Sequence, residues 1–336
     1  MNIFHGTIEI AGQMGILSGE LKRRGHKAVG YNIFNSYLGY RDHLILTNAH
    51  EIANTHRHII NFFDLFHFHY ASSLIPQYKD LEIIRDKGKK MIMHHWGNDV
   101  RFHDAARKNN PYVFTGDSLP NEVIHERLSQ ISEYIREAVV QDYEVYEYVK
   151  PYYEKVHVVP ISIDLSAFVP SSGKKEKKKP LVLHAPTNPD FKGTHVIEEA
   201  IRSLQMKYDF DYRRIEKMNH EKAIRLYRDA DFIVDQIRCG SYGLLSVEAM
   251  ALGKPVVAYI REDLISKFPQ DLPILNANPD NVAEQMKLLL DNPELREELG
   301  AKGRKYAETY HAKEIVVDRL ERIYSGGETL NGGELA

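Results

Sequence analysis

The sequence predicts an α/β protein with two Rossmann-like halves, each a parallel sheet with helices on both faces. Short apolar runs alternate with helical stretches along most of the chain, a pattern typical of such sheets. The alternation stops at a Pro-, Ser- and Lys-rich stretch over residues 166–180, which is typical of a linker, and then begins again. The length of 336 residues also suits two domains.

The first half is predicted over residues 1–165. Its opening segment, 1–31, indicates a strand, a loop containing Gly12 and Gly15, a helix and a second strand. Further strands are predicted at 64–69, 90–94, 138–140 and 156–159, with helices at 74–87 and 121–135. The glycine loop would therefore lie at a helix N-terminus, where a parallel sheet presents a ligand.

The second half is predicted over residues 181–311. Strands are expected at 181–185, 231–234 and 255–259, and helices at 196–204, 244–252, 281–290 and 293–310. A last helix, within 312–325, is expected to complete the first half, and residues 326–336 are expected to form a flexible tail. A cleft between the two halves would be the default ligand site.

Composition excludes several classes of protein. The chain has 44 Lys and Arg against 47 Asp and Glu, so it lacks the basic excess of a dedicated nucleic-acid binder. Its single cysteine, Cys239, excludes an intramolecular disulfide and a Cys-rich metal site. We find no secretory signal and no apolar run of roughly 20 residues. We therefore expect a cytoplasmic protein, with peripheral membrane association left open.

Residues 240–258 form the most specific stretch of the sequence. Gly240 and Gly243 permit a turn after a strand, and the helix that follows ends at Gly253. The backbone amides of Gly243 and Leu244 would suit phosphate oxygens at the start of this helix. Glu248, further along, would accept the vicinal hydroxyls of a ribose.

This stretch resembles the donor-site signature of GT-B glycosyltransferases of the family-4 type. In that signature a Glu, seven residues and a second Glu precede Ala-Met-Ala, Gly and Pro-Val. Similar segments follow the family's order along most of the chain: 12–26, 64–69, 94–101, 158–164, 184–194 and 293–310. The resemblance implies the two-domain GT-B fold and metal-independent transfer of a sugar, with retention of configuration and no cofactor. The donor would be a nucleotide-diphosphate sugar, with a UDP-sugar expected. The acceptor would be a glycan, a cell-surface polysaccharide or a small molecule.

The resemblance also implies roles for particular residues. Glu248 would bind the ribose, and Lys192 with Gly193 would hold the diphosphate. The loop at Gly12 would approach the donor phosphates or the acceptor. His95 would contact the donor sugar or the acceptor, and Asp99 would serve the acceptor hydroxyl or its own loop. The competing interpretation of Lys192 is a solvated lysine, and that of Gly12 is a plain turn before a helix. His95 would otherwise be a hydrogen-bonded structural histidine, and Asp99 a turn aspartate that bonds its own backbone.

Two positions depart from the family pattern. Gly240 stands where the family has its first glutamate, and Thr187 stands where it has an arginine. Asp235 or Gln236 would be substitutes for the glutamate, and Arg238 for the arginine. These departures support a second hypothesis, a degenerate protein that binds a nucleotide sugar or glycan without turnover. A sugar-nucleotide epimerase of the same fold is the third hypothesis.

The 17 histidines raise the question of a metal site. His67 and His69 would share one face of a strand, near His94 or His95 on a neighbouring strand. Strand alternation sends His94 and His95 to opposite faces. The sequence has no His-Glu-x-x-His helix and no cysteine pair, and we predict no metal.

Overall fold

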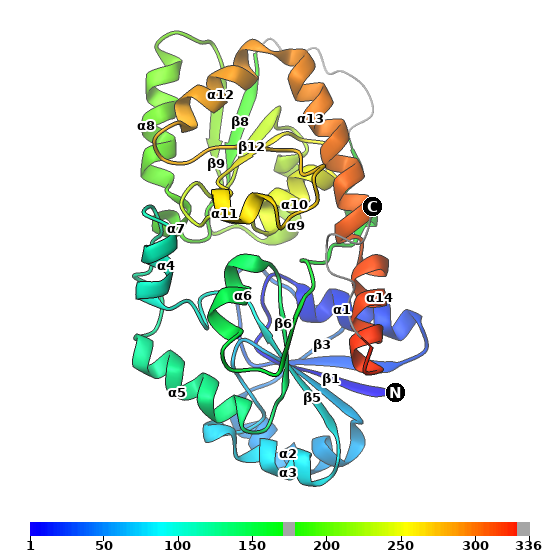
Figure 1. Ribbon diagram of the computed structural model, residues 1–336. Coiled ribbons are helices and arrows are strands. Elements are labelled where there is room, and N and C mark those ends of the chain that lie inside the picture. The colour runs from blue at the N-terminus through cyan, green and yellow to red at the C-terminus, as the bar shows by residue number, and fades with distance from the viewer. Residues whose placement is uncertain (171–178, 328–336) are drawn as a thin grey trace. The chain divides into compact units, whose positions relative to one another are not determined.

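The computed structural model describes residues 1–170 and 179–327 (Figure 1). The chain forms two compact units. Among the described residues, the first unit contains 1–106, 115–162 and 313–327, and the second contains 107–114 and 163–312. Most of the predicted linker and tail, at 171–178 and 328–336, lies outside the described residues. The sequence did not predict that the segment 107–114 belongs with the second unit.

The first unit contains a seven-stranded parallel sheet in the order β3-β2-β1-β4-β5-β6-β7. Its strands are β1 (Asn2–Thr7), β2 (Lys27–Asn32), β3 (Leu44–Leu46), β4 (Leu65–His69), β5 (Lys90–His95), β6 (Glu137–Val140) and β7 (Lys155–Val158). Its helices are α1 (Gln13–Arg23), α2 (Ala49–Phe62), α3 (Lys79–Asp86), α5 (Asn121–Ser132), α6 (Tyr143–Val149) and α14 (Lys313–Tyr324), and α4 (His103–Asn109) continues into the segment 107–114.

The second unit contains a five-stranded parallel sheet in the order β12-β11-β10-β8-β9. Its strands are β8 (Leu181–His184), β9 (Asp211–Arg214), β10 (Phe232–Val234), β11 (Val256–Ala258) and β12 (Ile274–Asn276). Its helices are α7 (Pro189–Lys192), α8 (Thr194–Gln205), α9 (His220–Tyr227), α10 (Leu244–Ala251), α11 (Glu262–Ile265), α12 (Val282–Asp291) and α13 (Pro293–Tyr306). The predicted pair of Rossmann-like halves is confirmed.

Helix α10 is the most deeply buried helix of the second unit. Every residue from Leu245 to Ala251 is buried, because the helix is apolar on almost all sides. Helix α13 covers it through glycines: a Cβ atom at Gly300 would lie 2.2 Å from the carbonyl oxygen of Gly253. A Cβ atom at Gly303 would lie 3.2 Å from Met250 Cγ. This packing fixes α10 against the sheet.

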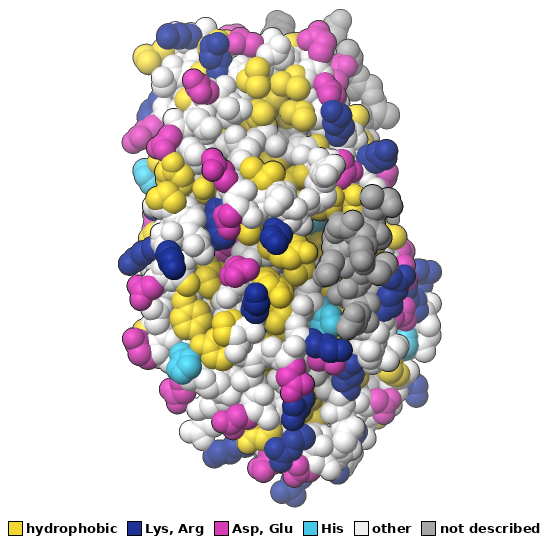
Figure 2. Space-filling view, viewed as in Figure 1, with side chains coloured by type: hydrophobic (Ala, Val, Ile, Leu, Met, Phe, Trp, Pro, Cys, Tyr) yellow, Lys and Arg dark blue, Asp and Glu magenta, His cyan; other side chains and the backbone are white. Residues whose placement is uncertain are grey.

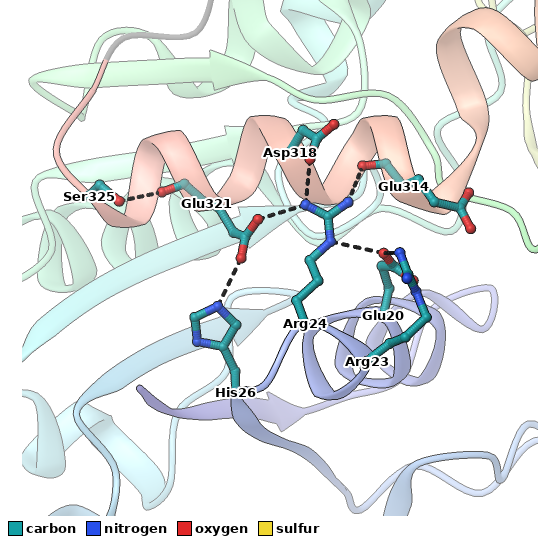
Figure 3. A network of polar contacts seen from close by, with 8 residues as sticks. All are labelled: Glu20, Arg23, Arg24, His26, Glu314, Asp318, Glu321 and Ser325. Atoms are coloured by element: carbon teal, nitrogen blue, oxygen red, sulfur yellow. Dashed lines mark hydrogen bonds and ion pairs between the residues drawn. The ribbon is translucent and has the colours of Figure 1, made fainter.

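Helix α14 packs against α1 in the first unit (Figure 3). Val317 and Leu320 of α14 share an apolar cluster with Leu17 and Leu21 of α1. At the edge of this cluster, Arg24 bonds Glu20 Oε1 at 2.8 Å and Glu321 Oε2 at 2.6 Å, and it also pairs with Asp318. His26 bonds the other oxygen of Glu321 at 2.8 Å. The segment Arg23–His26 therefore anchors helix α14 to the first unit.

The surface carries charges of both signs. On the face shown in Figure 2, Lys and Arg side chains are interspersed with Asp and Glu side chains, as the near-neutral total predicts. No helix in the described part of the chain has the length and apolar character needed to cross a membrane.

Each sheet has one point where the strand order reverses. In the first unit the chain proceeds outward from β1 to β3 and then returns to β4 on the other side of β1. In the second unit β8 is followed by β9 on one side and β10 on the other. Open α/β sheets bind ligands beyond the carboxyl ends of their strands at such points. The sites to inspect therefore follow β1 and β4 in one unit, and β8 and β10 in the other.

Candidate functional site

A buried ion pair lies at the reversal point of the second unit. Lys192 ends α7, which follows β8, and Asp235 directly follows β10. Lys192 Nζ lies 2.5 Å from Asp235 Oδ1. Asp235 Oδ2 accepts hydrogen bonds from the Ser246 hydroxyl at 2.6 Å and the Ser246 amide at 3.2 Å, in the first turn of α10. The pair joins both strand ends to the start of α10.

The surroundings keep Asp235 charged. Its complete burial by itself raises the pKa of this carboxyl, but the Lys192 charge and the hydrogen bonds from Lys192 and Ser246 outweigh that effect and lower the pKa below its usual value. The Lys192 side chain is 9% exposed and can donate in three directions. Lys192 is therefore a fixed, partly neutralised cation, and not a solvated lysine.

Two glycines, Gly193 and Gly243, allow the backbone to pack closely against the residues that follow Asp235. Gly193 has φ +79°, ends α7 and begins α8, and a Cβ atom there would lie 2.8 Å from Ile237 Cγ1. Gly243 caps α10 ahead of Leu244, and its Cβ position is 3.1 Å from Gln236 Oε1. The Gln236 amide in turn donates to the Ser241 carbonyl at 2.5 Å. Asp235 and Gln236 are thus both bonded within this turn.

Glu248 lies in α10, with its side chain 3% exposed, and pairs with a residue that sequence reasoning missed. His220, the first residue of α9, bonds Glu248 Oε1 through Nε2. Burial lowers the pKa of His220, but the hydrogen bond and negative charge of Glu248 outweigh burial and raise the pKa above its ordinary value. No sequence motif signals this contact, because 28 residues separate its members.

Arg261 fills the space beside Gly240. Gly240 has φ +89°, and a Cβ atom there would lie 2.7 Å from Arg261 Cγ. The Arg261 guanidinium bonds both oxygens of Asp263, at 2.9 and 2.7 Å. A glutamate at position 240 would therefore displace Arg261. The same arginine lines a polar hollow of about 620 Å³ beyond β11 and β12, together with Tyr112, Tyr259 and several asparagines.

Thr187 and Arg238, the two positions that bear on the missing family arginine, lie in different surroundings. Thr187 is exposed. Arg238 donates to the Tyr112 carbonyl at 2.7 Å and to the Asp190 carbonyl at 3.1 Å. Its guanidinium is thus held by backbone oxygens.

The glycine loop of the first unit follows β1, at that sheet's reversal point. Gly12 has φ +79°, and a Cβ atom there would lie 2.9 Å from the Tyr40 ring. Glu9 occupies the amides that begin α1: its oxygens accept from Met14 at 3.3 Å and Gly15 at 3.1 Å. Burial raises the pKa of Glu9 to about 8, against the opposing effect of these amides. The helix N-terminus is thus already capped by a carboxyl group.

The structure brings His95 and Asp99 together after β5. His95 Nδ1 lies 2.7 Å from Asp99 Oδ2, and His95 Nε2 lies 2.8 Å from the Tyr153 hydroxyl. Asp99 also accepts from the amides of Trp96 and Gly97, both at 3.0 Å. The side chains of His95 and Asp99 are 0% and 1% exposed. As placed, the pair fixes the loop after β5.

Four histidines line the opposite face of this sheet. His5, His67, His69 and His94 share a face because the first two and the last two are register partners on adjacent strands. The expected separation of His94 from His95 is confirmed. Ring nitrogens of His5, His67 and His69 lie within 4.8 Å of one another, although sequence reasoning identified only the His67 and His69 pair of these three.

The hydrogen bonds describe a network of neutral rings. Trp96 Nε1 donates to His69 Nδ1 at 3.3 Å, so a neutral His69 carries its proton on Nε2 and donates to His5 Nδ1 at 3.1 Å. Burial, together with repulsion among the rings, holds the pKa of His67, His69 and His94 well below the usual value. In this arrangement both nitrogens of His69 are engaged in hydrogen bonds.

Comparisons with known proteins agree with this architecture. Residues 181–322 match a family model described as glycosyl transferase-like. An uncharacterized glycosyltransferase of Methanocaldococcus jannaschii is 25% identical over 157 residues. That match covers 40% of this chain and 44% of the relative, so it spans less than half of either protein.

Solved glycosyltransferases share the fold over nearly the whole chain. Anabaena HepE, in complex with UDP and glucose, has a TM-score of 0.69 at 11% identity and covers 97% of this chain and 99% of its own. A glycosyltransferase from Rickettsia africae has a TM-score of 0.68 at 15% identity, covering 96% and 97%. Sucrose-phosphate synthase from Thermosynechococcus elongatus has a TM-score of 0.65 at 13% identity, covering 97% and 99%. The chain therefore has the GT-B fold, and its residues 181–322 resemble a glycosyl transferase-like family.

Proposed function

We propose that this protein is a retaining, metal-independent glycosyltransferase of the family-4 type. It would transfer a sugar from a nucleotide-diphosphate sugar to a glycan, a cell-surface polysaccharide or a small-molecule acceptor. The observation that carries the proposal is the Lys192 and Asp235 pair, which sets a fixed cation at the reversal point of the second sheet beside the start of α10. The complexes of HepE with UDP and UDP-glucose support a uridine nucleotide as the donor to test first.

The proposed chemistry rests on charge and position. Lys192 Nζ and the first amides of α10 would stabilise the negative charge that grows on the leaving diphosphate. Glu248 would accept a ribose hydroxyl and orient the donor. As the bond from the anomeric carbon to the phosphate oxygen breaks, the acceptor hydroxyl would bond that carbon from the same side. The leaving phosphate oxygen would take the hydroxyl proton, so no protein base is required.

In the first unit we propose positioning roles for the predicted residues. Glu9 and Gly12 would shape the loop after β1, and the buried His95 and Asp99 pair would hold the loop after β5. Backbone and side chains of these loops would then contact the acceptor. A cytoplasmic location, peripheral membrane contact and the absence of a nucleic-acid partner stay predictions.

A second function is favoured by the surroundings of Gly240 and Lys192. Arg261 occupies the place of a side chain at 240, and Asp235 neutralises part of the Lys192 charge. Both features would weaken catalysis more than binding. The alternative is thus a protein that binds a nucleotide sugar or glycan without turnover.

One experiment separates the two functions. The protein is incubated with UDP-, GDP- and ADP-sugars, with and without acceptor glycans, and released nucleoside diphosphate is measured beside calorimetric binding. An enzyme consumes a donor that it binds, and consumption rises with the right acceptor. A donor that binds but is never consumed indicates the second function.

Variants test the location of the donor. Lys192→Ala and Glu248→Ala should each weaken binding by about 1–3 kcal/mol, the scale of a lost hydrogen bond to a charged group. Lys207→Ala, at an exposed lysine of the same unit, is the matched control. Unchanged affinity in both test variants would show that the donor binds elsewhere.

A further inference from the structure

One carboxylate oxygen of Glu248 is hydrogen-bonded, and the other is available to a ligand. Its Oε1 pairs with His220 Nε2, and within the described part of the chain its Oε2 bonds to no other side chain. The carboxylate comes from α10, whose surroundings are apolar, and its side chain is 3% exposed. A carboxylate so buried requires a partner to stay charged and correctly oriented.

His220 is placed to be that partner. It is the first residue of α9, and the Asn219 side chain caps this helix by accepting from the Glu221 amide at 3.1 Å. The cap fixes the start of the helix and hence the position of the imidazole. The His220 side chain is 21% exposed, so it reaches solvent while its Nε2 faces the buried carboxylate.

We propose that His220 is a positioning residue for nucleotide recognition: it holds Glu248 charged and aimed so that Oε2 accepts a single ribose hydroxyl of the donor. This inference rests on the proposed function, because it assigns the ribose to Glu248. It also sharpens that function. A carboxylate that used both oxygens would bind both vicinal hydroxyls, whereas this one keeps only one oxygen for the ligand.

The charge state of the pair agrees with the geometry. The pKa of His220 is raised, despite the opposing effect of burial, by Glu248 and to a smaller degree by Glu221. The contact with Glu248 therefore favours the protonated form of His220. The positive end of the pair is the partly exposed one, and the negative end is the buried one.

The test compares ligands that differ by one hydroxyl. Dissociation constants for UDP, 2′-deoxy-UDP and 3′-deoxy-UDP are measured by calorimetry with the wild type, His220→Ala, His220→Gln and Glu248→Gln. In the wild type, loss of one of the two hydroxyls should weaken binding roughly tenfold or more, and loss of the other should have little effect. For each deoxynucleotide we take the ratio of its dissociation constant to that of UDP. Glu248→Gln should reduce the larger of the two ratios severalfold.

The histidine variants decide the inference. His220→Ala should bring the larger ratio close to one, and His220→Gln, which keeps a donor at the same place, should restore most of it. A structural loss alone would weaken the three nucleotides equally and leave the ratio unchanged. Thermal unfolding of each variant checks folding, and His195→Ala, an exposed histidine on α8, is the matched control.

Two results would overturn the inference in distinguishable ways. If the ratio falls in Glu248→Gln but persists in His220→Ala, Glu248 needs no help from His220, and the proposed function survives alone. If the wild type binds none of the three nucleotides, nor GDP or ADP, the proposed function fails together with this inference.

Discussion

Lys192 and Asp235 form an ion pair in which the carboxylate is fully buried and the ammonium reaches the edge of the site, with 2.5 Å between Nζ and Oδ1. Breaking such a pair from one side leaves a buried charge without a partner. Lys192→Ala should lower the free energy of unfolding by about 3–5 kcal/mol. Lys192→Ala combined with Asp235→Asn should recover much of this loss, because the remaining amide is neutral. Urea denaturation measures both, and equal losses in the two variants would contradict the pairing.

A glutamate at position 240 should destabilise the protein. Gly240→Glu places an L side chain at φ +89° and against Arg261, so we expect a loss of about 2–4 kcal/mol from backbone strain and overpacking. Arg261→Ala relieves the second cause only. The double variant should therefore lose less stability than the sum of the single variants, which a double-mutant cycle of denaturation midpoints would show. Additive losses would mean that the two side chains do not compete for this space.

Glu9 should make the protein less stable in mild alkali. Its pKa is raised to about 8 in the folded state from 4.5, so the folded state retains a proton that the unfolded state has lost. This contribution is complete below pH 4.5 and disappears as the pH rises through 8. Between pH 7 and 9 the wild type should lose about 1 kcal/mol more than Glu9→Gln does. Denaturant titrations at both pH values test this, and parallel losses would place Glu9 outside the titration.

The histidine cluster of the first unit, formed by His5, His67, His69 and His94, should make the protein less stable in acid. Their pKa values are lowered by burial, so the unfolded state binds protons that the folded state excludes. Stability is therefore full above about pH 6.5 and falls as the pH decreases below it. His94→Phe keeps a ring against Trp96 but removes one titrating group. It should reduce the slope of stability between pH 6 and 5 by up to about 1.4 kcal/mol per pH unit. His58→Phe, at an exposed position of α2, should leave the slope unchanged.

The sequence predicts those elements that have a strong local pattern. The strand, glycine loop and helix at 1–31 and the helix after Gly243 appear where periodicity and punctuation place them. Strands β3, β9 and β12 were missed, because none of their side chains is buried, so burial does not impose on them the apolar pattern that marks the other strands. Helix α3 begins at Lys79, later than the predicted residue 74, because a 3-10 turn at Pro76–Tyr78 precedes it.

Long-range partners explain what the sequence left out of the site. His220 and Arg261 carry no recognisable motif, and only the folded chain brings them near Glu248 and Gly240, respectively. Glu9 bonds the α1 amides five and six residues along the chain, and no motif marks this contact either. Strand register is likewise absent from a single sequence. It places His5 beside His67, although 62 residues separate them.

The return of α14 to the first unit has a consequence for biosynthesis. The apolar cluster of that unit needs Val316, Val317, Leu320 and Ile323, and Arg24 finds its partners on the same helix. The ribosome makes these residues after it has made every described residue of the second unit. The apolar cluster of the first unit therefore cannot be completed until α14 has been made, although most of that unit is made first. Until then the side chains of Leu17 and Leu21 lack the apolar partners that α14 provides.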